Sequence, residues 1–446
     1  MKQILIVILL ALSGAASLFA QNTPPRILCG NTVFSHVIRE KYPELQAAFD
    51  QTFEEARRRP AVAGERSPLN IKVVVHVVWN AAAENLADSI IENQIDILNQ
   101  DFNRQNADTA NLRPLFQPVA GNADIHFELQ QIVRVQTSQL FSLDILGNSL
   151  LSELKHDNEG GSDAWDTEKY LNIWVCKIQP TTIFGIPIGQ ILGFAFPPNN
   201  LANWPPDSGA PSADEDGVVI DYRMMGRNNP NPLPNPAGGG NLLVRGRTPV
   251  HEVGHFLGLR HILGYGVLFG PINCAESDGV DDTPYANSQS EFNCDKTRNT
   301  CEQVEVFYND DVPDLVENFM DYSSEDCMNM FTKGQVELMR NVLAGPRSGL
   351  LESSGLPGVN GEETAWRLLP NPTNSVCWVE FQSEKAQEMA FRVIGADGRM
   401  ILQRAAQTWL PGTHRVSFDL SQQPAGLYFV EITTPQGRAA KKLIRE

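Results

Sequence analysis

Apolar residues along this chain fall into short runs that predict a sheet. Residues 71–79, IKVVVHVVW, are rich in β-branched side chains, which predicts a buried strand. Similar apolar runs at 170–178, 193–197 and 217–225 predict further strands. His76 lies within the first run and has no neighbour at metal-ligand spacing, so we expect it to be a histidine of the core.

The segments between and around these predicted strands show helical periodicity. Residues 89–102 carry apolar side chains three and four positions apart, which predicts a helix with one buried face. Ser89 and Glu92 stand three apart at its start and predict a capping box. Residues 34–56 and 332–343 have helical spacing as well.

The first 66 residues are predicted to be segments that are removed from the mature protein. Residues 1–20 join Lys2 to an apolar run and a cleavage point after Ala20, the pattern of an export signal, with a membrane anchor as the alternative. Residues 21–66 are polar and rich in arginine. They predict a pro-segment with a cut near Arg66, and the alternative is an extension that stays attached.

The last quarter of the chain has a different pattern. Residues 346–363 are rich in Gly, Ser and Pro and predict a linker. Residues 364–446 alternate apolar and polar positions in short runs separated by turns, which predicts a small all-β sandwich. The intervening residues 67–345 form the main domain.

Composition narrows the function without identifying it. The 446 residues suggest two or three domains, and a hydrophobic fraction of 42% is enough for sizeable cores. A formal charge of -18 repels phosphate backbones, so nucleic acid is not expected as a partner. After the first 20 residues no segment is apolar enough to predict a membrane span, and export would permit disulfides.

The motif HEVGHFLGLRH, which begins at residue 251, carries the chemistry. His251 and His255 are four apart and face the same side of a helix, where they can bind one ion. Glu252 is rotated about 100° from His251 and stands beside that ion. Gly258 can adopt the left-handed conformation that ends a helix, which lets His261 approach from another direction.

Three neutral imidazoles and one open position are typical of catalytic zinc. Such a metal lowers the pKa of its water, and Glu252 can accept the proton and pass it to a leaving amine. A short HExxH match alone is weak, and its alternative is a solvated helix face. The full spacing with glycine and a third histidine is much more specific.

At these residues the sequence resembles the metzincin metalloproteases. ENFMDY supplies Met320 and Tyr322, which match the methionine turn beneath the metal and a tyrosine that helps hold the oxyanion in several metzincins. The blocks GGSDAWDTEKYLNIWVCKI, GRTPVHEVGHFLGLRH, DGVDDTP and NFMDYSSEDCMNMFTKGQ resemble the pappalysin family, especially its shorter bacterial members. This resemblance covers residues 67–345.

The resemblance implies an endopeptidase of the α+β metzincin fold. We expect a twisted mixed sheet with the active-site helix beneath it, followed by an irregular C-terminal subdomain. The strand GFAFP, at 193–197, would be the edge that pairs with a peptide substrate.

Seven cysteines are present, and four of them lie close together. Four cysteines allow three pairings, and a second structural metal is a further alternative. The family resemblance implies the disulfides Cys274–Cys301 and Cys294–Cys327. Cys176 and Cys377 lie in strand patterns and are expected to be buried thiols.

Two further ligand sites are predicted. The acidic run near Asp278 concentrates hard oxygen ligands, and its resemblance to related proteases implies calcium on Asp278 and Thr283, with solvated loop acids as the alternative. Cys29, in PRILCGN, resembles the cysteine of other metzincin pro-segments and could place its thiolate on the open zinc position. Otherwise it is an incidental thiol.

The C-terminal blocks LLPNPTNSVCWVEF, SFDLSQQPAGLYFVEI and AAKKLIRE resemble the type IX secretion sorting domain. This implies export to the periplasm, passage through the type IX secretion machinery, and a secreted or cell-surface product. The alternative is a sandwich that binds carbohydrate or a partner.

The leading hypothesis is a secreted zinc endopeptidase made as a latent precursor, acting on proteins or peptides with Glu252 as general base and acid. A surface-displayed binding or adhesion protein with a vestigial metal site is the alternative, and a zinc hydrolase of other substrates is a third. The intact histidines, Glu252 and Tyr322 argue against a vestigial site.

Overall fold

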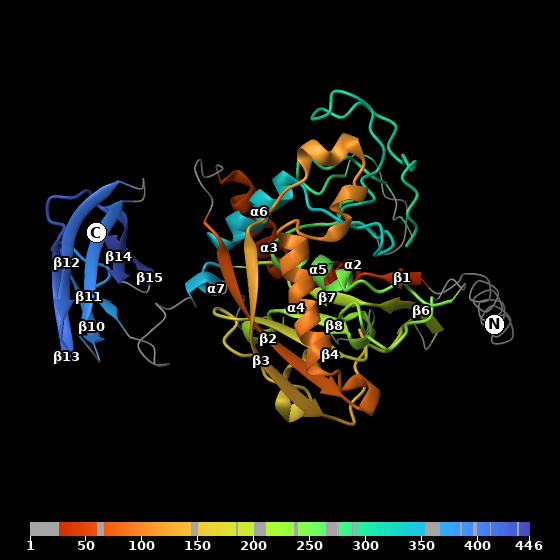
Figure 1. Cartoon of the computed structure of the whole chain (residues 1–446), viewed down its shortest axis with the longest axis horizontal. Helices are drawn as coiled ribbons and strands as arrows, with labels where there is room; N and C mark the ends of the chain where they lie inside the picture. Colours follow the sequence, from red (N-terminus) through yellow and green to blue (C-terminus); the bar gives the residue numbers. More distant parts are fainter. Residues whose placement is uncertain are drawn as a thin grey trace, which may run out of the picture. The chain divides into compact units, whose positions relative to one another are not determined.

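The computed structural model divides the chain into two compact units, Met1–Leu351 and Glu352–Glu446 (Figure 1). The predicted export signal, the predicted cut near Arg66 and most of the predicted linker lie outside the described residues. No helix within the described part is long and apolar enough to span a membrane. The structure describes residues 26–59, 67–143, 150–183, 186–199, 211–235, 240–264, 274, 276–287, 290, 292–352, 366–383, 386–395, 399–410, 412–434 and 437–446.

Five of the described strands form the central sheet of the first unit, in the order β3-β2-β4-β8-β7. The first four run parallel, and β7 pairs antiparallel with β8 at the end of that order. The mixed sheet expected from the sequence is therefore present. The strands are β2 (Leu69–Trp79), β3 (Ile125–Gln136), β4 (Leu171–Cys176), β7 (Gly193–Ala195) and β8 (Val218–Asp221).

Strands β4, β7 and β8 are buried on both faces. Alternate residues of each strand point to opposite sides of the sheet. Ile173 and Val175 of β4 join the core that packs under the helices α4 (Asp88–Phe102), α5 (Arg247–Phe256) and α6 (Lys333–Leu343). Trp174 and Cys176 join a second core on the opposite face. His76 also points to that face, where it stacks on Trp174 and contacts Ser162 and Asn172 as a core histidine.

The helices differ from the sequence predictions at their ends. Helix α4 (Asp88–Phe102) begins after Ala87, so Ser89 lies inside the helix and the predicted capping box is wrong. Helix α6 (Lys333–Leu343) does have a capping box, made by Thr332 and Gln335. The remaining helix of this region is α7 (Gly349–Glu352).

The predicted strand at 217–225 is shorter than expected. Strand β8 stops at Asp221 because the carboxylate of that residue accepts a hydrogen bond from the backbone N–H of Arg223 and starts a 3-10 helix, Tyr222–Met224. The other 3-10 helices among the described residues are Ala82–Glu84, Ala107–Asn111, Pro114–Val119, Ser152–Lys155, Asp157–Glu159 and Ala213–Glu215.

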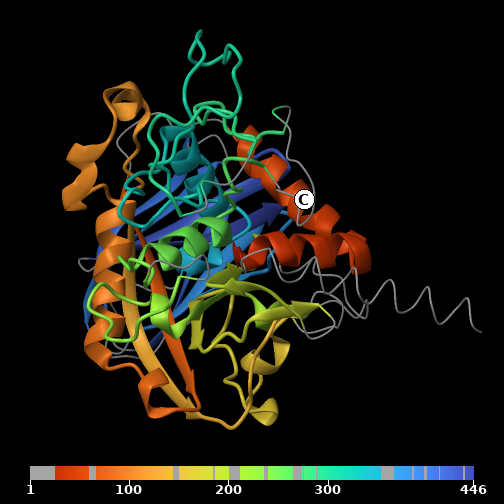
Figure 2. The same ribbon diagram turned by 90° about the vertical axis from the view of Figure 1, so that its right-hand side faces the viewer.

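The predicted pro-segment folds onto the first unit. Strand β1 (Arg26–Leu28) pairs in parallel with β6 (Ile186–Ile191), which pairs antiparallel with β5 (Thr181–Ile183). The helical spacing of 34–56 forms two helices, α2 (Gly30–Lys41) and α3 (Pro43–Arg58), because Pro43 cannot donate to the preceding turn and starts a new helix. Figure 2 shows these helices in red, beside the sheet and the green helix α5.

The second unit is the β-sandwich expected from its alternating pattern. Its described strands form two antiparallel sheets, in the orders β13-β10-β9 and β12-β11-β14-β15, which enclose a core around Phe381, Phe391 and Val430. The strands are β9 (Arg367–Leu369), β10 (Val376–Ser383), β11 (Gln387–Gly395), β12 (Met400–Trp409), β13 (Gly412–Asp419), β14 (Gly426–Thr434) and β15 (Gly437–Arg445).

A buried ion pair joins the sheet edge, helix α5 and the segment after α6. The Arg347 guanidinium binds the Asp216 carboxylate, and these two side chains are 3% and 1% exposed. It also donates to the backbone carbonyls of Phe256, at 2.8 Å, and Phe196, at 3.2 Å. A cation buried this deeply depends on all of these acceptors.

Replacing Arg347→Met should lower the free energy of unfolding of the first unit by about 3–5 kcal/mol, because Asp216 would stay buried without its cation. Urea denaturation followed by fluorescence measures this change. The matched control is Arg134→Met, whose ion pair with Asp88 is 30% and 66% exposed and should cost less than about 1 kcal/mol. A loss for Arg347→Met no larger than for the control would contradict the prediction.

Candidate metal centre

Helix α5 (Arg247–Phe256) carries the first half of the histidine motif. It begins after Gly246, which has a φ of 75°. The helix packs closely against β7, since a Cβ added to Gly193 would lie 2.8 Å from the side chain of Glu252. This approach brings the helix against the strand at the end of the sheet order.

The chain reverses just after α5, at Gly258. Its φ of +97° lies in the left-handed region, and an added Cβ would lie 2.9 Å from Val342 of α6. Glycine is therefore required for both conformation and space. The reversal carries His261 back over the helix, as the spacing of the motif predicts.

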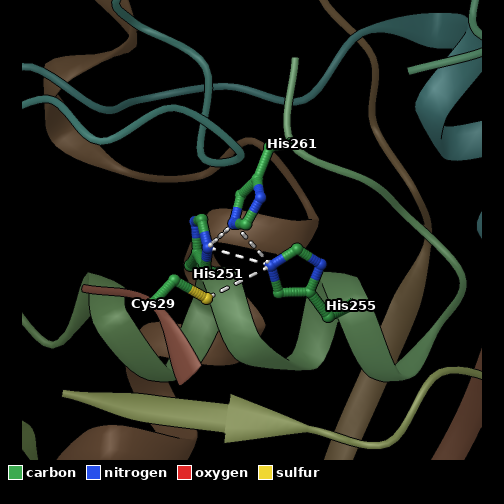
Figure 3. A group of neighbouring side chains, drawn as sticks. All are labelled: Cys29, His251, His255 and His261. Atoms are coloured by element: carbon green, nitrogen blue, oxygen red, sulfur yellow. Dashed lines mark hydrogen bonds between the residues drawn. The ribbon is translucent and has the colours of Figure 1, made fainter. Parts of the chain in front are cut away.

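The structure brings the three motif histidines together. The Nε2 atoms of His251 and His255 are 3.1 Å apart, and those of His251 and His261 are 3.3 Å apart. The Nε2 atoms of His255 and His261 are 3.0 Å apart. Cys29, at the start of α2, directs its Sγ to the same point, 3.6 Å from the Nε2 of His255 (Figure 3). All four ligand atoms lie within 4.8 Å of one another.

Hydrogen bonds orient two of these rings. The Nδ1 of His251 lies 2.6 Å from the carbonyl oxygen of Phe319, and the Nδ1 of His255 lies 2.8 Å from that of Leu259. Since a carbonyl only accepts, each Nδ1 is the protonated nitrogen and each Nε2 keeps its lone pair. Burial lowers the pKa of His251 to about 4 and holds the pKa values of His255 and His261 well below the usual range. Neutral imidazoles and a cysteine sulfur are a donor set that fits zinc.

Glu252 stands beside the histidines with one oxygen ready for a partner. Its Oε1 lies 3.5 Å from the Cys29 Sγ, and its buried Oε2 has no hydrogen-bond partner among the described residues. Burial raises the pKa of Glu252 to about 8. A buried carboxyl with an unused oxygen is expected where a water or substrate atom must be bound.

The methionine turn lies under and beside this cluster. Met320 is fully buried beneath α5, where its sulfur would lie 2.6 Å from a Cβ added to Gly254. The ring of Tyr322 lies 4.7 Å from that of His261. Its hydroxyl is 3.1 Å from the Oγ1 of Thr32, in the predicted pro-segment. Burial raises the pKa of Tyr322, so the phenol keeps its proton.

Two hollows flank the cluster. One is lined by His255, His261 and pro-segment residues, and has an empty volume of about 560 Å³. The other is lined by Glu252, Tyr322 and Met328 among others, and has an empty volume of about 360 Å³. Cys29 also lines this second hollow. The predicted pro-segment therefore lines hollows on both sides of the histidine cluster.

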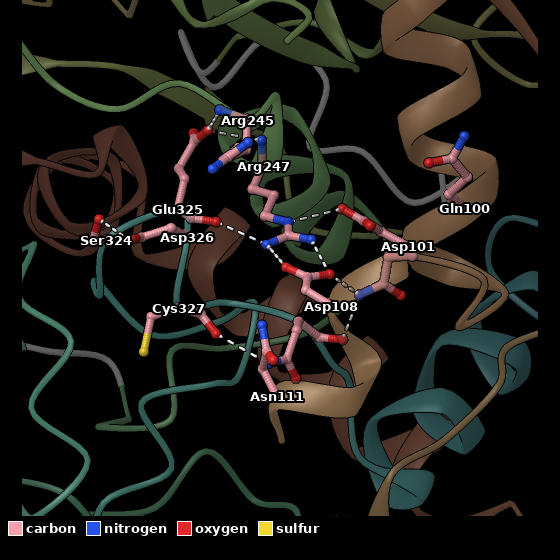
Figure 4. Close-up of polar contacts among 12 residues, drawn as sticks. Gln100, Asp101, Asp108, Asn111, Arg245, Arg247, Ser324, Glu325, Asp326 and Cys327 are labelled. Carbon is pink, nitrogen blue, oxygen red and sulfur yellow. Dashed lines mark hydrogen bonds and ion pairs between the residues drawn. The ribbon is translucent and has the colours of Figure 1, made fainter. Parts of the chain in front are cut away.

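A carboxylate missed by sequence reasoning fixes the start of α5. The two oxygens of Glu325 accept hydrogen bonds from the backbone N–H groups of Arg245, Arg247 and Thr248 (Figure 4). The Arg247 side chain in turn binds Asp101, Asp108 and the Glu325 carbonyl. A negative charge at a helix start stabilises the helix. No local pattern could reveal it, because Glu325 and the helix are far apart along the chain.

The cysteine-rich region contains both disulfides that the family resemblance implied, Cys274–Cys301 and Cys294–Cys327. Cys176 and Cys377 are buried thiols outside these disulfides, as predicted. In this region Thr283 donates a 2.7 Å hydrogen bond to the Oδ1 of Asp278. The Oδ2 of Asp278 and the Oδ1 of Asp282 are buried and have no hydrogen-bond partner among the described residues.

Two family models match the chain. Residues 242–344 match the peptidase family described as "Pregnancy-associated plasma protein-A". Residues 367–446 match the secretion system C-terminal sorting domain.

Solved structures and other sequences agree with the first match. Mature mirolysin of Tannerella forsythia, solved with a cleaved peptide, is 34% identical, with 64% of this chain and 97% of that chain covered and a TM-score of 0.51. A promirolysin mutant from the same organism is 32% identical, with 73% and 97% covered and a TM-score of 0.54. Extracellular metalloprotease 1 of Coccidioides posadasii is 26% identical over 292 residues, or 65% of this chain and 82% of that protein.

Proposed function

The chain belongs to the pappalysin family of metzincin metalloproteases and ends in a type IX secretion sorting domain, and we propose that this secreted metalloendopeptidase is made as a latent zinc enzyme. The observation that carries the proposal is the cluster of three Nε2 atoms with a pro-segment thiol at the fourth corner. His251, His255 and His261 would hold the zinc, and Cys29 would complete the set until the pro-segment is removed. The substrates would be proteins or peptides.

Once the pro-segment has dissociated, the residues around the cluster would each take one role in peptide hydrolysis. Bound zinc polarises a carbonyl and lowers the pKa of water. Glu252 would accept the proton of the attacking water through Oε2 and deliver it to the leaving amine. The Tyr322 hydroxyl, released from Thr32, would donate a hydrogen bond to the carbonyl oxygen of the bond being cut. Strand β7 would align the peptide by backbone pairing.

The functional boundaries that we propose follow the sequence. The sorting domain would pass the protein through the type IX secretion machinery, after the signal has directed it to the periplasm. The proposed segments are a signal at 1–20, a pro-segment at 21–66, a catalytic domain at 67–345, a linker at 346–363 and the sorting domain at 364–446.

We expect Glu252→Ala to lower casein cleavage by about 10²–10⁴-fold, because the proton transfer loses its base and acid. The assay uses the precursor after tryptic removal of its pro-segment, with zinc content measured in parallel. Glu92→Gln, an exposed change on α4, is the matched control and should cleave as the unaltered enzyme does. A chelator should abolish cleavage and zinc should restore it. Equal cleavage by the Glu252→Ala enzyme would reject the proposed role.

Cys29→Ala should shorten the lag of self-activation in the full precursor by about tenfold, the rate change for a loss of ~1.4 kcal/mol. The thiol contacts Glu252 and His255, and it also accepts a hydrogen bond from the Asn31 backbone at the start of α2. Removing it therefore opens the cluster and weakens the helix start. Gel analysis of precursor conversion measures the lag. Cys377→Ala, at a buried thiol in the sorting domain, is the control. An unchanged lag for Cys29→Ala would reject the thiol lock.

We also propose calcium at Asp278 and Thr283, supported by the unpartnered carboxylate oxygens of Asp278 and Asp282. A calcium concentration 100 times the Kd should raise the melting temperature of the precursor by about 5–10 °C. Differential scanning calorimetry with a calcium-selective chelator measures this shift. Asp278→Asn should remove most of it. The absence of any shift in the unaltered precursor would reject the site.

A further inference from the structure

The larger hollow contains a cation that the proposed mechanism does not use. Arg260 lies between Gly258 and His261, and it lines the hollow together with His255 and His261. Pro197 and Pro198, which follow β7, form another part of the lining. Arg260 therefore faces the space beside the metal ligands, next to the strand proposed to align the substrate.

The pro-segment lines this hollow with side chains that complement Arg260 in charge and shape. The Oδ1 of Asp50, on α3, lies 3.2 Å from the Nη2 of Arg260. The guanidinium carbon lies 3.6 Å from the centre of the Phe53 ring, one helical turn further along the same face of α3. The Arg260 side chain is 19% exposed in this arrangement. An acidic group and an aromatic ring thus hold the cation in the precursor.

Removal of the pro-segment takes both of these groups away. The carboxylate of Asp50 and the ring of Phe53, which both contact the guanidinium, belong to α3. Arg260 therefore loses the Asp50 carboxylate and the Phe53 ring, while it stays at the wall of the substrate space. A partly buried guanidinium next to a low-dielectric wall favours a new carboxylate partner.

We propose that Arg260 is a specificity residue of the mature enzyme and binds an acidic side chain of the substrate close to the scissile bond. The proposal rests on the proteolytic function proposed above. In the precursor, Asp50 would mimic that acidic side chain. The hollow beside His255 and His261 would be the subsite for an acidic substrate residue. The identity of the arginine, and not only its bulk, then matters for the choice of cleavage site.

The test compares matched peptides after tryptic activation of the full precursor. A mixed peptide library first gives the positions around the cut at which Asp or Glu is enriched. Pairs of peptides that differ only by Asp or Asn at the enriched position then give a ratio of kcat/KM. We expect a ratio of about ten for the unaltered enzyme, the effect of one hydrogen bond to a charged group.

Two substitutions separate charge from structure. Arg260→Gln should bring the ratio close to one, and Arg260→Lys should keep part of the preference because it keeps the charge. The ratio cancels any general loss of activity, and zinc content reports whether the neighbouring His261 is still in place. An unaltered enzyme that cleaves without acidic enrichment at any position, or an Arg260→Gln enzyme that keeps the ratio, would overturn the inference. Failure to cleave even the Asn peptides would instead reject the proteolytic function.

Discussion

The reversal of the backbone at Gly258 is the constraint on which the site depends. A residue with a side chain would be strained at a φ of +97° and would also meet Val342 of α6. The close approach of α6 therefore selects the residue that lets the chain turn. This turn places the Nε2 of His261 within 3.3 Å of the Nε2 atoms of His251 and His255. A helix continued past this point would carry the third imidazole away from the other two.

Around this turn, the centre is held by groups from distant parts of the chain. The carbonyl of Phe319 orients His251, and Met320 fills the space under Gly254. The Glu325 carboxylate accepts hydrogen bonds from the first N–H groups of α5 and so fixes the start of the helix without help from a metal. One stretch of seven residues, 319–325, thus supplies an orienting acceptor, a packing surface and a cap. The geometry of the site therefore depends on this stretch as much as on the histidine motif.

Local patterns predicted those features that depend on local physics. The strand β2 and the helix α6 follow from apolar periodicity, and the reversal at Gly258 follows from its lack of a Cβ. Features that depend on tertiary contacts could not be predicted from local patterns. The cap by Glu325 joins segments 77 residues apart, as its bond to Thr248 shows. The false capping box shows the converse. Ser89 and Glu92 have the right residue types and spacing, but the N-cap of α4 is Ala87, two residues before Ser89.

The proposed pro-segment takes part in both hydrophobic cores of the first unit. Phe34 packs against Phe196 in the core on one face of the sheet, and Phe53 belongs to the core on the other. Scission of the connecting peptide leaves these rings where they are, since no packing contact is cut with the bond. Activation as proposed above would therefore be two events with separate rates. The second, dissociation of the cut fragment from the catalytic domain, would set how long each molecule stays inactive after it has been cut.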